Sequence, residues 1–478
     1  MTRVVIAGAA QLSCRADPPS PVALAAEVAR AASADAGADL LPRVQAVAVV
    51  DPFSWPVVDP GALVCAELGI AAATLKSAIG GTGPLVLLGA LGARIAAGEL
   101  DCALLVGSEV FSGFKRQMAG EDLGWPANAD GTPVPETLGE TDAASHPLET
   151  AAGMIAPLMY YPLFEHALRG AHGRSVDEQA ARSGALWARF AQVARDNPHA
   201  WTPDPPADPG AVGDGNRMAA HPYPKFETAN IQVDQAAALI LMSDEAADAA
   251  GVPRERRVTV HATATAHDAW FAANRAELHR SPALRACARA VSVDLDDVAH
   301  LDLYSCFPSA VQIAGAELGI DPLTDARPPT VTGGLTFAGG PANNYVTHAL
   351  AAMTSRLRDD PAARGICTAV GWYMTKHGIG VLAGPDAPAA DAILDAHPQA
   401  AVDALPTRAV ADDGPVTATV EGYTALYDRD GNPTMGIVAG LTDDGRRTFG
   451  QTPAGAQLVA GDPLGRAAEF DGAGLVRL

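Results

Sequence analysis

A glycine-rich turn in front of an alanine- and leucine-rich stretch constrains the fold more than any other feature of this sequence. Residues 76–83 read Lys-Ser-Ala-Ile-Gly-Gly-Thr-Gly, Pro84 follows, and the apolar run 102–106 comes next. Proline is favoured in the first turn of a helix, so the pattern predicts a helix over 84–97 and a buried strand after it. A glycine turn that leads into a helix can present a chemical group at the positive end of that helix. The turn is therefore the first candidate for a functional site.

The segments around this turn alternate between strand and helix patterns. Apolar runs predict buried strands, and apolar faces at helical spacing predict helices. In the first half the predicted strands are 3–11, 44–50 and 237–242, and the predicted helices are 21–36, 59–68 and 245–250. In the second half the predicted strands are 258–265, 301–304, 365–370 and 378–383, and the predicted helices are 282–291 and 309–318. The repeated order predicts an α/β fold with an internal duplication.

Two parts of the chain depart from this alternation. Residues 111–224 are rich in proline and contain helical stretches over 153–172 and 177–196, which predicts an inserted helical subdomain. The segment 221–236 then returns to the core.

The end of the chain has a different composition. Residues 386–411 are rich in alanine, proline and aspartate, which predicts a linker with a helical piece near 391–396. Beyond it, turn signals at 428–432 and 443–445 separate strand patterns and predict a small antiparallel β domain. The predicted domains are thus 1–250 with its insertion, 251–385, the linker 386–411 and the β domain 412–478.

The charge balance excludes several classes of partner. The sequence has 33 Lys and Arg against 55 Asp and Glu, a net charge of -22, and no basic run. We therefore expect no nucleic-acid partner and no binding to an anionic membrane. Apolar runs are too short for a signal peptide or a membrane span, so the expected location is the cytoplasm. The six cysteines are widely spaced, which predicts buried free thiols and no metal site.

The central turn resembles that of the thiolase superfamily. In thiolases it reads Cys-Gly-Ser-Gly or Cys-Ala-Thr-Gly, and the cysteine is the nucleophile that accepts the acyl group. Here Gly80 stands at the cysteine position. The resemblance extends to residue 385, and 412–478 resembles the additional C-terminal domain of type 1 thiolase-like proteins. It implies a duplicated αβαβα layered core, a helical loop domain inserted over the acyl-CoA site, and an added antiparallel β domain.

Two further catalytic positions of thiolases are also replaced. Thiolases read Gly-Gly-x-x-x-x-Gly-His-Pro where residues 333–341 read Gly-Gly-Leu-Thr-Phe-Ala-Gly-Gly-Pro, so Gly340 takes the place of the catalytic histidine. The position of the second catalytic cysteine falls on 371–373, which read Gly-Trp-Tyr. The resemblance therefore implies an acetyl-CoA acetyltransferase-like scaffold that lacks the side chains of Cys-dependent Claisen condensation.

The remaining candidate catalytic residues are Tyr304, Cys306 and His377. Residues 301–307 read Leu-Asp-Leu-Tyr-Ser-Cys-Phe, where thiolases of the sterol-carrier type have His-Asp-Cys-Phe. Tyr304 thus replaces the histidine, and Cys306 matches the cysteine. His377 follows Lys376 in a glycine-flanked turn, where it either faces the pocket or lies in a surface turn.

The resemblance also implies coenzyme A or an acyl-CoA as ligand. Backbone N–H groups of glycine turns at helix starts can hold a thioester oxygen or a phosphate. The candidate cofactor-binding residues are Lys225, Asn230, Gly81, Gly339 and Asn344. Asn230 falls where thiolases place a CoA-contacting serine, whereas Asn344 and its neighbour Asn343 either cap a helix or contact the ligand.

Three functions fit these observations. The first is a CoA or acyl-CoA binding protein of lipid metabolism that lacks Claisen activity. The second is an enzyme with altered chemistry, such as a retro-aldolase: cysteine-free thiolase relatives of that kind use tyrosines, and Tyr304 matches one of their positions while Gly340 stands at the other. The third is a scaffold that binds a protein partner through the C-terminal β domain. Homodimer and monomer both remain open.

Overall fold

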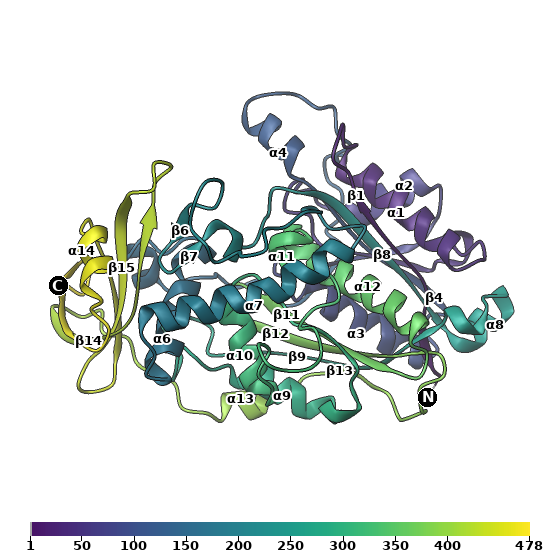
Figure 1. Ribbon diagram of the computed structural model, residues 1–478. Helices are drawn as coiled ribbons and strands as arrows, with labels where there is room; N and C mark the ends of the chain where they lie inside the picture. The colour runs from purple at the N-terminus through teal and green to yellow at the C-terminus, as the bar shows by residue number, and fades with distance from the viewer. Residues whose placement is uncertain (1) are drawn as a thin grey trace.

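The computed structural model describes residues 2–478, and its first half contributes one side of a large mixed β-sheet (Figure 1). The strands of this half are β1 (Val4–Ser13), β2 (Ala46–Val49), β3 (Ala73–Ser77), β4 (Cys102–Val110) and β8 (Asp234–Ser243). Its helices are α1 (Pro21–Asp35), α2 (Pro60–Leu68), α3 (Gly83–Ala96) and α8 (Asp244–Ala250). Local chemistry sets the boundaries, since the Ser20 and Asp59 side chains cap α1 and α2 and Gly251 ends α8 in a left-handed conformation.

The second half repeats the pattern and joins the same sheet. Its strands are β9 (Val258–His267), β10 (His300–Asp302), β11 (Arg364–Gly371) and β12 (Lys376–Ala383). Its helices are α9 (Pro282–Ala290), α10 (Pro308–Leu318), α11 (Gly334–Phe337) and α12 (Tyr345–Asp359). A short antiparallel pairing of Val5 and Ile6 with the start of β9 connects the two halves.

The helices form layers on both sides of the sheet. α3 and α12 contact strands of both halves and make the central layer, while α1 covers the outer face of the first half and α9 that of the second. Leu88 and Leu91 of α3 and Leu350 of α12 are completely buried there. The predicted duplicated αβαβα core is therefore confirmed.

The inserted segment is mostly helical. It contains α4 (Phe111–Met118), β5 (Glu136–Leu138), α5 (Pro147–Ala151), α6 (Tyr161–Ala171), α7 (Val176–Asp196), β6 (Met218–Ala220) and β7 (Tyr223–Pro224). The helix predicted over 153–172 is too long. Gly153 has φ of 79° and Pro157 starts only a short 3-10 turn, so the α-helix begins at Tyr161. In addition, β5 pairs in parallel with β3 at the edge of the sheet.

The predicted linker is folded against the core. The helical piece expected near 391–396 is wrong, because β13 (Ile393–Ala396) pairs in parallel with β9. β1 pairs only with the start of β9, so the rest of that strand edge is available to β13. The short helix α13 (Gln399–Asp403) follows.

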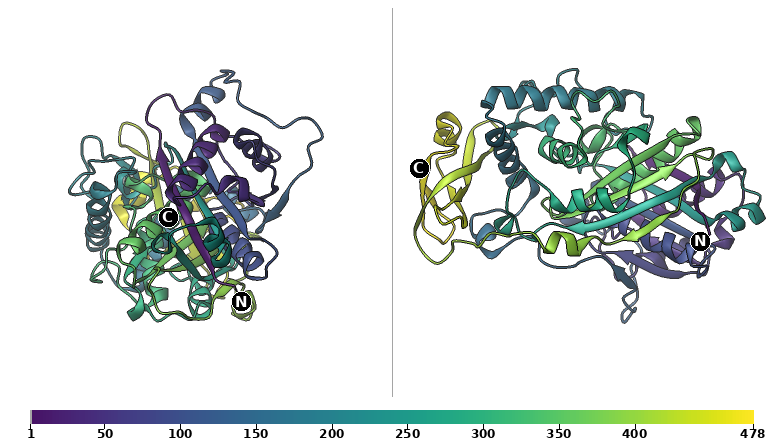
Figure 2. Two further views of the ribbon diagram at one scale, coloured as in Figure 1. Left: turned by 90° about the vertical axis from the view of Figure 1, so that its right-hand side faces the viewer. Right: turned by 90° about the horizontal axis from the view of Figure 1, so that it is seen from below.

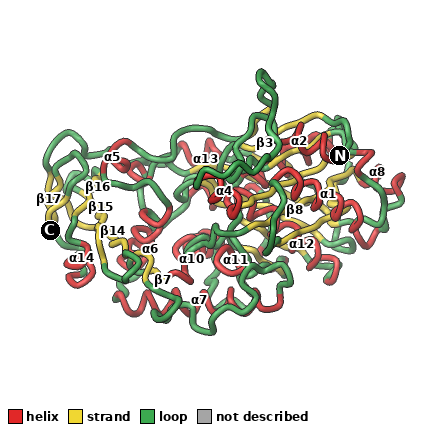
Figure 3. The backbone as a smooth tube through the Cα atoms, turned by 90° about the horizontal axis from the view of Figure 1, so that it is seen from above, coloured by secondary structure: helices red, strands yellow, loops and turns green. Residues whose placement is uncertain are grey.

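The C-terminal part forms a second, antiparallel sheet, as predicted. Its elements are β14 (Val416–Tyr427), β15 (Pro433–Leu441), β16 (Arg447–Thr452), α14 (Gly455–Gly461), β17 (Ala467–Phe470) and β18 (Val476–Arg477). β14 pairs with β15 and β17, and β6 of the insertion adds to it. This sheet lies at the end of the molecule opposite the N-terminus (Figures 2 and 3). Among residues 2–478, no helix has the length and apolar character needed to cross a membrane.

Candidate functional site

The motifs identified in the sequence meet around one cavity of 590 Å³. They contribute Gly80 and Gly81 before α3, Tyr304 and Cys306 after β10, and Gly340 and Asn343 before α12. Val370 near the end of β11 and Trp372 and Tyr373 between β11 and β12 complete this set. Strand ends and helix starts from both halves of the chain thus converge at a single place. Turns in such positions leave backbone and short side chains facing the cavity.

The rest of the wall is apolar. Residues 155–158 and Tyr161 of the insertion form one side of the cavity. Phe53, Ile79, Ile155 and Ile231 also line it, although each is between 43% and 68% exposed to solvent. Large apolar side chains gathered at an opening indicate a binding surface. Among the described residues that line the cavity, none carries a charge.

The turn at Gly80 is held by an asparagine side chain. Gly80 has φ of 137°, a backbone conformation that favours glycine. Its N–H donates to Asn343 Oδ1 at 2.9 Å, and Asn343 Nδ2 donates to the carbonyl of Asp51 at 2.9 Å. The Gly80 N–H is therefore already bonded. The expected capping role of Asn344 is not seen, because its side chain makes no cap and lies against Gly107 instead.

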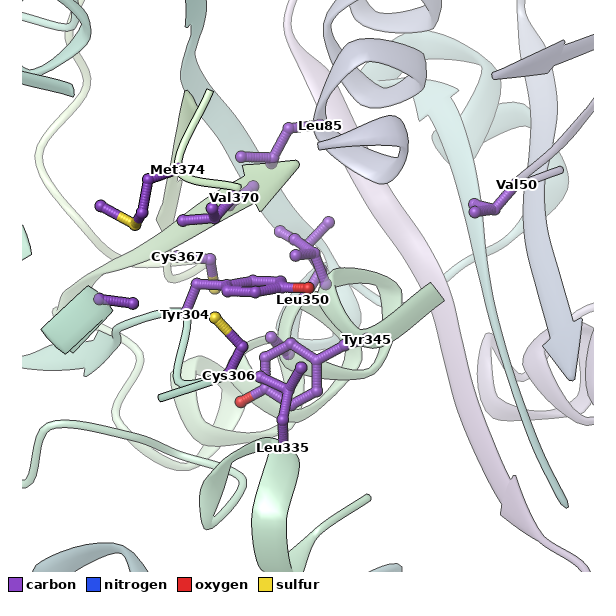
Figure 4. Close-up of a cluster of buried hydrophobic side chains, with 14 of the residues drawn as sticks. Val50, Leu85, Tyr304, Cys306, Leu335, Tyr345, Leu350, Cys367, Val370 and Met374 are labelled. Atoms are coloured by element: carbon purple, nitrogen blue, oxygen red, sulfur yellow. The ribbon is translucent and has the colours of Figure 1, made fainter. Parts of the chain in front are cut away.

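Gly81 lies directly beneath Tyr304. A Cβ atom on Gly81 would stand 2.5 Å from the Tyr304 hydroxyl oxygen and even closer to the carbonyl oxygen of Val370. The Tyr304 ring packs edge-on against Tyr345, with ring centroids 5.5 Å apart, and the sulfur of Cys306 lies beside it (Figure 4). Burial raises the pKa of Tyr304 above its usual range, so the hydroxyl keeps its proton at neutral pH.

Cys306 faces the cavity as a neutral thiol. Burial raises its pKa to about 12, and a hydrogen bond with Tyr161 offsets this only in part. Nucleophilic cysteines have lowered pKa values and a nearby base or cation. No histidine or lysine is among the described residues that line the cavity. Cys306 therefore lacks the surroundings of an activated nucleophile.

His377 lies neither in the pocket nor in a surface turn, the two placements expected from the sequence. β12 begins at Lys376, so the histidine is inside the sheet and completely buried. Its Nε2 is 3.2 Å from Asp268 Oδ2 and 2.9 Å from the carbonyl oxygen of Met374. Burial alone would raise the pKa of Asp268, but the hydrogen bond and charge of His377 lower it overall. His377 and Asp268 therefore form a buried pair away from the cavity.

The predicted coenzyme A contacts are only partly gathered at the cavity. Gly81 lines it, whereas Gly339 packs on the Gln235 amide and Asn344 packs on β4. Lys225 is exposed, and the Asn230 side chain accepts a hydrogen bond from the N–H of Gln232. Lys225 nevertheless shortly precedes the segment 228–231 and Asn230 belongs to it, and the other three residues of that segment line the cavity: Thr228, Ala229 and Ile231.

An aromatic wall is the feature that the sequence did not reveal. Tyr161 stacks on Phe307 with ring centroids 4.5 Å apart, and its hydroxyl donates to the carbonyl of Trp372 at 3.3 Å. Tyr373 stacks on Tyr160 at 3.8 Å. Trp372 has φ of 52°, an uncommon conformation for a bulky residue and one that clusters at functional sites. The paired tyrosines at 160 and 161 were visible in the sequence, but nothing linked them to residues 372–373.

Metal chemistry has no site among the described residues. Within residues 2–478, no three His, Cys, Asp or Glu side chains are grouped so that they could hold a metal ion.

A family model matches the end of the chain. The model is described as "Thiolase-like protein type 1 additional C-terminal domain" and matches residues 398–469. This range includes α13 and most of the C-terminal sheet. No curated protein matches the sequence.

Solved structures resemble the whole chain. A monomeric SCP2-thiolase like protein type 1 (STLP1) from Mycobacterium smegmatis is 31% identical, with a TM-score of 0.83 and 99% of both chains covered. Two more distant structures share the fold over 80% of this chain. They are the Ltp2-ChsH2(DUF35) aldolase, with 16% identity, a TM-score of 0.59 and 98% of that chain covered, and an acetyl-CoA acetyltransferase from Syntrophomonas wolfei, with 14% identity, a TM-score of 0.55 and 99% of that chain covered.

Proposed function

This chain belongs to the type 1 thiolase-like proteins, and from that premise we propose that its cavity binds coenzyme A or an acyl-CoA thioester without Cys-dependent Claisen condensation. The observation that carries the proposal is the composition of the cavity wall. Gly80 and Gly340 line it at the positions where thiolases have the nucleophile and the catalytic histidine. The fold and the cavity are retained, while the groups that would form and break a covalent bond to the acyl group are missing.

The remaining walls suit a thioester with an apolar acyl group. Apolar side chains line the interior and the mouth, so an acyl chain would be removed from water at about 25 cal/mol per Å² of buried surface. The phosphates of coenzyme A would lie outside the uncharged cavity. Lys225 is exposed beside the lining segment 228–231 and is the cation that we assign to them.

Calorimetric titration with coenzyme A and with acetyl-CoA tests this proposal. A matched pair of variants places a charge at the mouth or away from it: Ile155 and Val134 are 68% and 71% exposed, but only Ile155 lines the cavity. We expect Ile155→Asp to weaken acetyl-CoA binding by about tenfold, or about 1.4 kcal/mol, and Val134→Asp to leave it unchanged. Absence of binding by the wild-type protein, or equal effects of the two variants, would sink the proposal.

Retro-aldol cleavage is a second candidate, favoured by the tyrosines around the cavity. Tyr161, Tyr304 and Tyr373 all line it, so a partner for Tyr304 need not come from position 340. In such a reaction the C2–C3 bond of a 3-hydroxyacyl thioester breaks and the 3-hydroxyl carbon becomes the carbonyl of an aldehyde or ketone. A tyrosine donates a proton to C2 of the enolate, and the hydroxyl proton returns to the tyrosinate. Release of an aldehyde or ketone from a 3-hydroxyacyl-CoA, lost in Tyr304→Phe, would support this candidate. Binding of the thioester without release of an aldehyde or ketone would support only the first proposal, ligand binding without cleavage.

We also propose that the protein acts as a monomer in the cytoplasm. β5 covers the outer edge of β3, so that edge has no free strand ladder for a second subunit. The similar protein from Mycobacterium smegmatis is described as monomeric. Sedimentation equilibrium at micromolar concentration checks the oligomeric state, and a dimer would contradict it.

A further inference from the structure

The C-terminal sheet packs directly on the helix that carries one wall of the cavity. β14 runs along α6 so closely that a Cβ at Gly422 would lie 2.8 Å from the carbonyl oxygen of Leu163. The ring of Tyr423 stacks on His166 of α6, with centroids 4.0 Å apart and planes at 21°. α6 therefore lies between β14 on one side and α10 on the other (Figure 1).

An ion pair between a buried arginine and a carboxylate that is 40% exposed reinforces this contact. The guanidinium of Arg169 on α6 is 5% exposed and donates to both carboxylate oxygens of Asp462, just after α14. Tyr423 Oη donates to Asp462 Oδ1 at 3.0 Å. Breaking such a pair leaves a buried charge without compensation, so its geometry is strongly maintained. We refer to Gly422, Tyr423 and Asp462 together as the α6 clamp.

The N-terminal end of α6 reaches the cavity. Tyr161, the first residue of α6, lines the cavity, and residues 155–158 just before it line it as well. The start of this stretch is also held by the C-terminal domain, since Gln451 Nε2 donates to the carbonyl of Ala151 at 3.0 Å. The C-terminal domain therefore contacts the chain on both sides of the wall segment 151–161, at Ala151 and at Leu163 of α6.

The wall also contacts the rest of the cavity: Tyr161 stacks on Phe307, and its carbonyl accepts a hydrogen bond from Ser309 Oγ at 3.0 Å. The Tyr373 hydroxyl donates to the carbonyl of Ile155 at 3.1 Å, and the Tyr161 hydroxyl donates to that of Trp372. These two bonds join the wall to Trp372 and Tyr373, which also line the cavity. Ile155 itself is largely exposed, so packing does little to hold it.

We propose that the C-terminal domain positions the cavity wall. The α6 clamp sets where Tyr161 and residues 155–158 stand and hence how well the cavity fits its ligand. Ligand binding and docking of the domain are then coupled in both directions, because each favours the same position of α6. This role does not depend on which ligand the cavity takes.

Hydrogen–deuterium exchange on the full-length protein, without ligand, tests the proposal. The variant Asp462→Ala removes the partner of Arg169, and Asp462→Glu restores a carboxylate. Glu469→Ala is the matched control, because Glu469 lies in the same domain, is exposed and contacts neither α6 nor the wall segment. We expect amide exchange over 151–161 to rise at least tenfold in Asp462→Ala, to recover in Asp462→Glu and to stay unchanged in Glu469→Ala.

A second variant covers the case in which Asp462→Ala unfolds the C-terminal domain. Gly422→Ala adds one methyl group that pushes on Leu163 while the ion pair stays intact. Peptides from β15 and β16 report whether the domain remains folded, and the 151–161 peptides report the wall. Faster exchange in the wall with a folded domain supports the positioning role. Unchanged exchange over 151–161, whether the domain is folded or not, overturns it.

Discussion

The hydroxyl of Tyr304 occupies the space above the α-carbon of Gly81, at the N-terminal end of α3. A Cβ on Gly81 would stand 2.5 Å from that hydroxyl oxygen and closer still to the Val370 carbonyl. By resemblance, Tyr304 stands at the position of a thiolase histidine, and Gly81 follows the position of the thiolase cysteine. These two residues are therefore in close steric contact. Tyr304 leaves no room for a side chain at position 81.

Gly81→Ala is expected to destabilise the protein by about 1–3 kcal/mol, the usual cost of overpacking a buried site. Gly340→Ala is the control, because its Cβ would meet its neighbours only at 3.3 to 3.4 Å. Urea unfolding measures both. Combining Gly81→Ala with Tyr304→Phe should recover part of the loss, since the phenylalanine lacks the hydroxyl but the Val370 carbonyl remains. Equal stability of the two alanine variants would contradict the close packing.

Cys306 is expected to resist alkylation at neutral pH. With its pKa raised to about 12 by burial, about one thiol in 10⁵ is ionised at pH 7. Cys14 is partly exposed and serves as the internal reference, although burial raises its pKa too. Iodoacetamide labelling followed by peptide mass spectrometry gives both rates. Faster labelling of Cys306 than of Cys14 would show that its thiol is activated.

Glu109 should make stability fall as the pH rises. Burial raises its pKa from 4.5 to about 7, although its oxygens accept hydrogen bonds from the N–H groups of Phe53 and Ser54. The folded state keeps the proton that the unfolded chain releases. The contribution of this group is therefore complete below pH 4.5 and lost as the pH rises through 7, a change of about 3 kcal/mol.

The variant Glu109→Gln tests this pH dependence. Its free energy of unfolding, measured in urea at about pH 5 and about pH 7.5, should lack the decrease attributed to Glu109. A variant with the same slope as the wild-type protein would place the pKa of Glu109 near its ordinary value.

His221 should have the opposite effect, at the junction with the C-terminal domain. Burial, aided by the charge of Arg169, lowers its pKa from 6.5 to about 4, and its ring stacks with His166 and Tyr423. Its contribution is complete above pH 6.5 and lost as the pH falls through 4, about 3 kcal/mol in all. His221→Phe keeps an aromatic ring without the titration, so its unfolding free energy should decrease less on acidification. An unchanged slope relative to wild type would refute this assignment.

Local signals explain the parts of the fold that were predictable. Pro84 after a glycine turn, Asp59 before an apolar helix and Gly251 after an alanine-rich one each act within a turn of the chain, and the helices begin and end there. The turns at 428–432 and 443–445 likewise separate the strands of the C-terminal sheet. Such signals need no knowledge of distant contacts.

The predictions from sequence are wrong where contacts between segments far apart in the chain determine the structure. Ile393 lies in the predicted linker. Residues 393–396 nevertheless form strand β13, because one edge of β9 remains free for pairing. The sequence predicts His377 in a turn, but β12 begins at Lys376 and pairs His377 with Ala266 of β9 inside the sheet, where Asp268 is its partner. The aromatic wall depends on Tyr160 meeting Tyr373, a contact made only when the insertion docks on the core. No spacing within one segment encodes these pairs.

Native mass spectrometry with acetyl-CoA tests the central claim most directly, because one spectrum reports binding and a second, under denaturing conditions, reports acylation. The structure predicts a complex of one acetyl-CoA per chain that dissociates on denaturation and leaves a protein of unmodified mass. An acetyl group that stays on the denatured chain would contradict the claim and point first to Cys306. If no complex formed, the claim that the cavity binds acetyl-CoA would be contradicted as well.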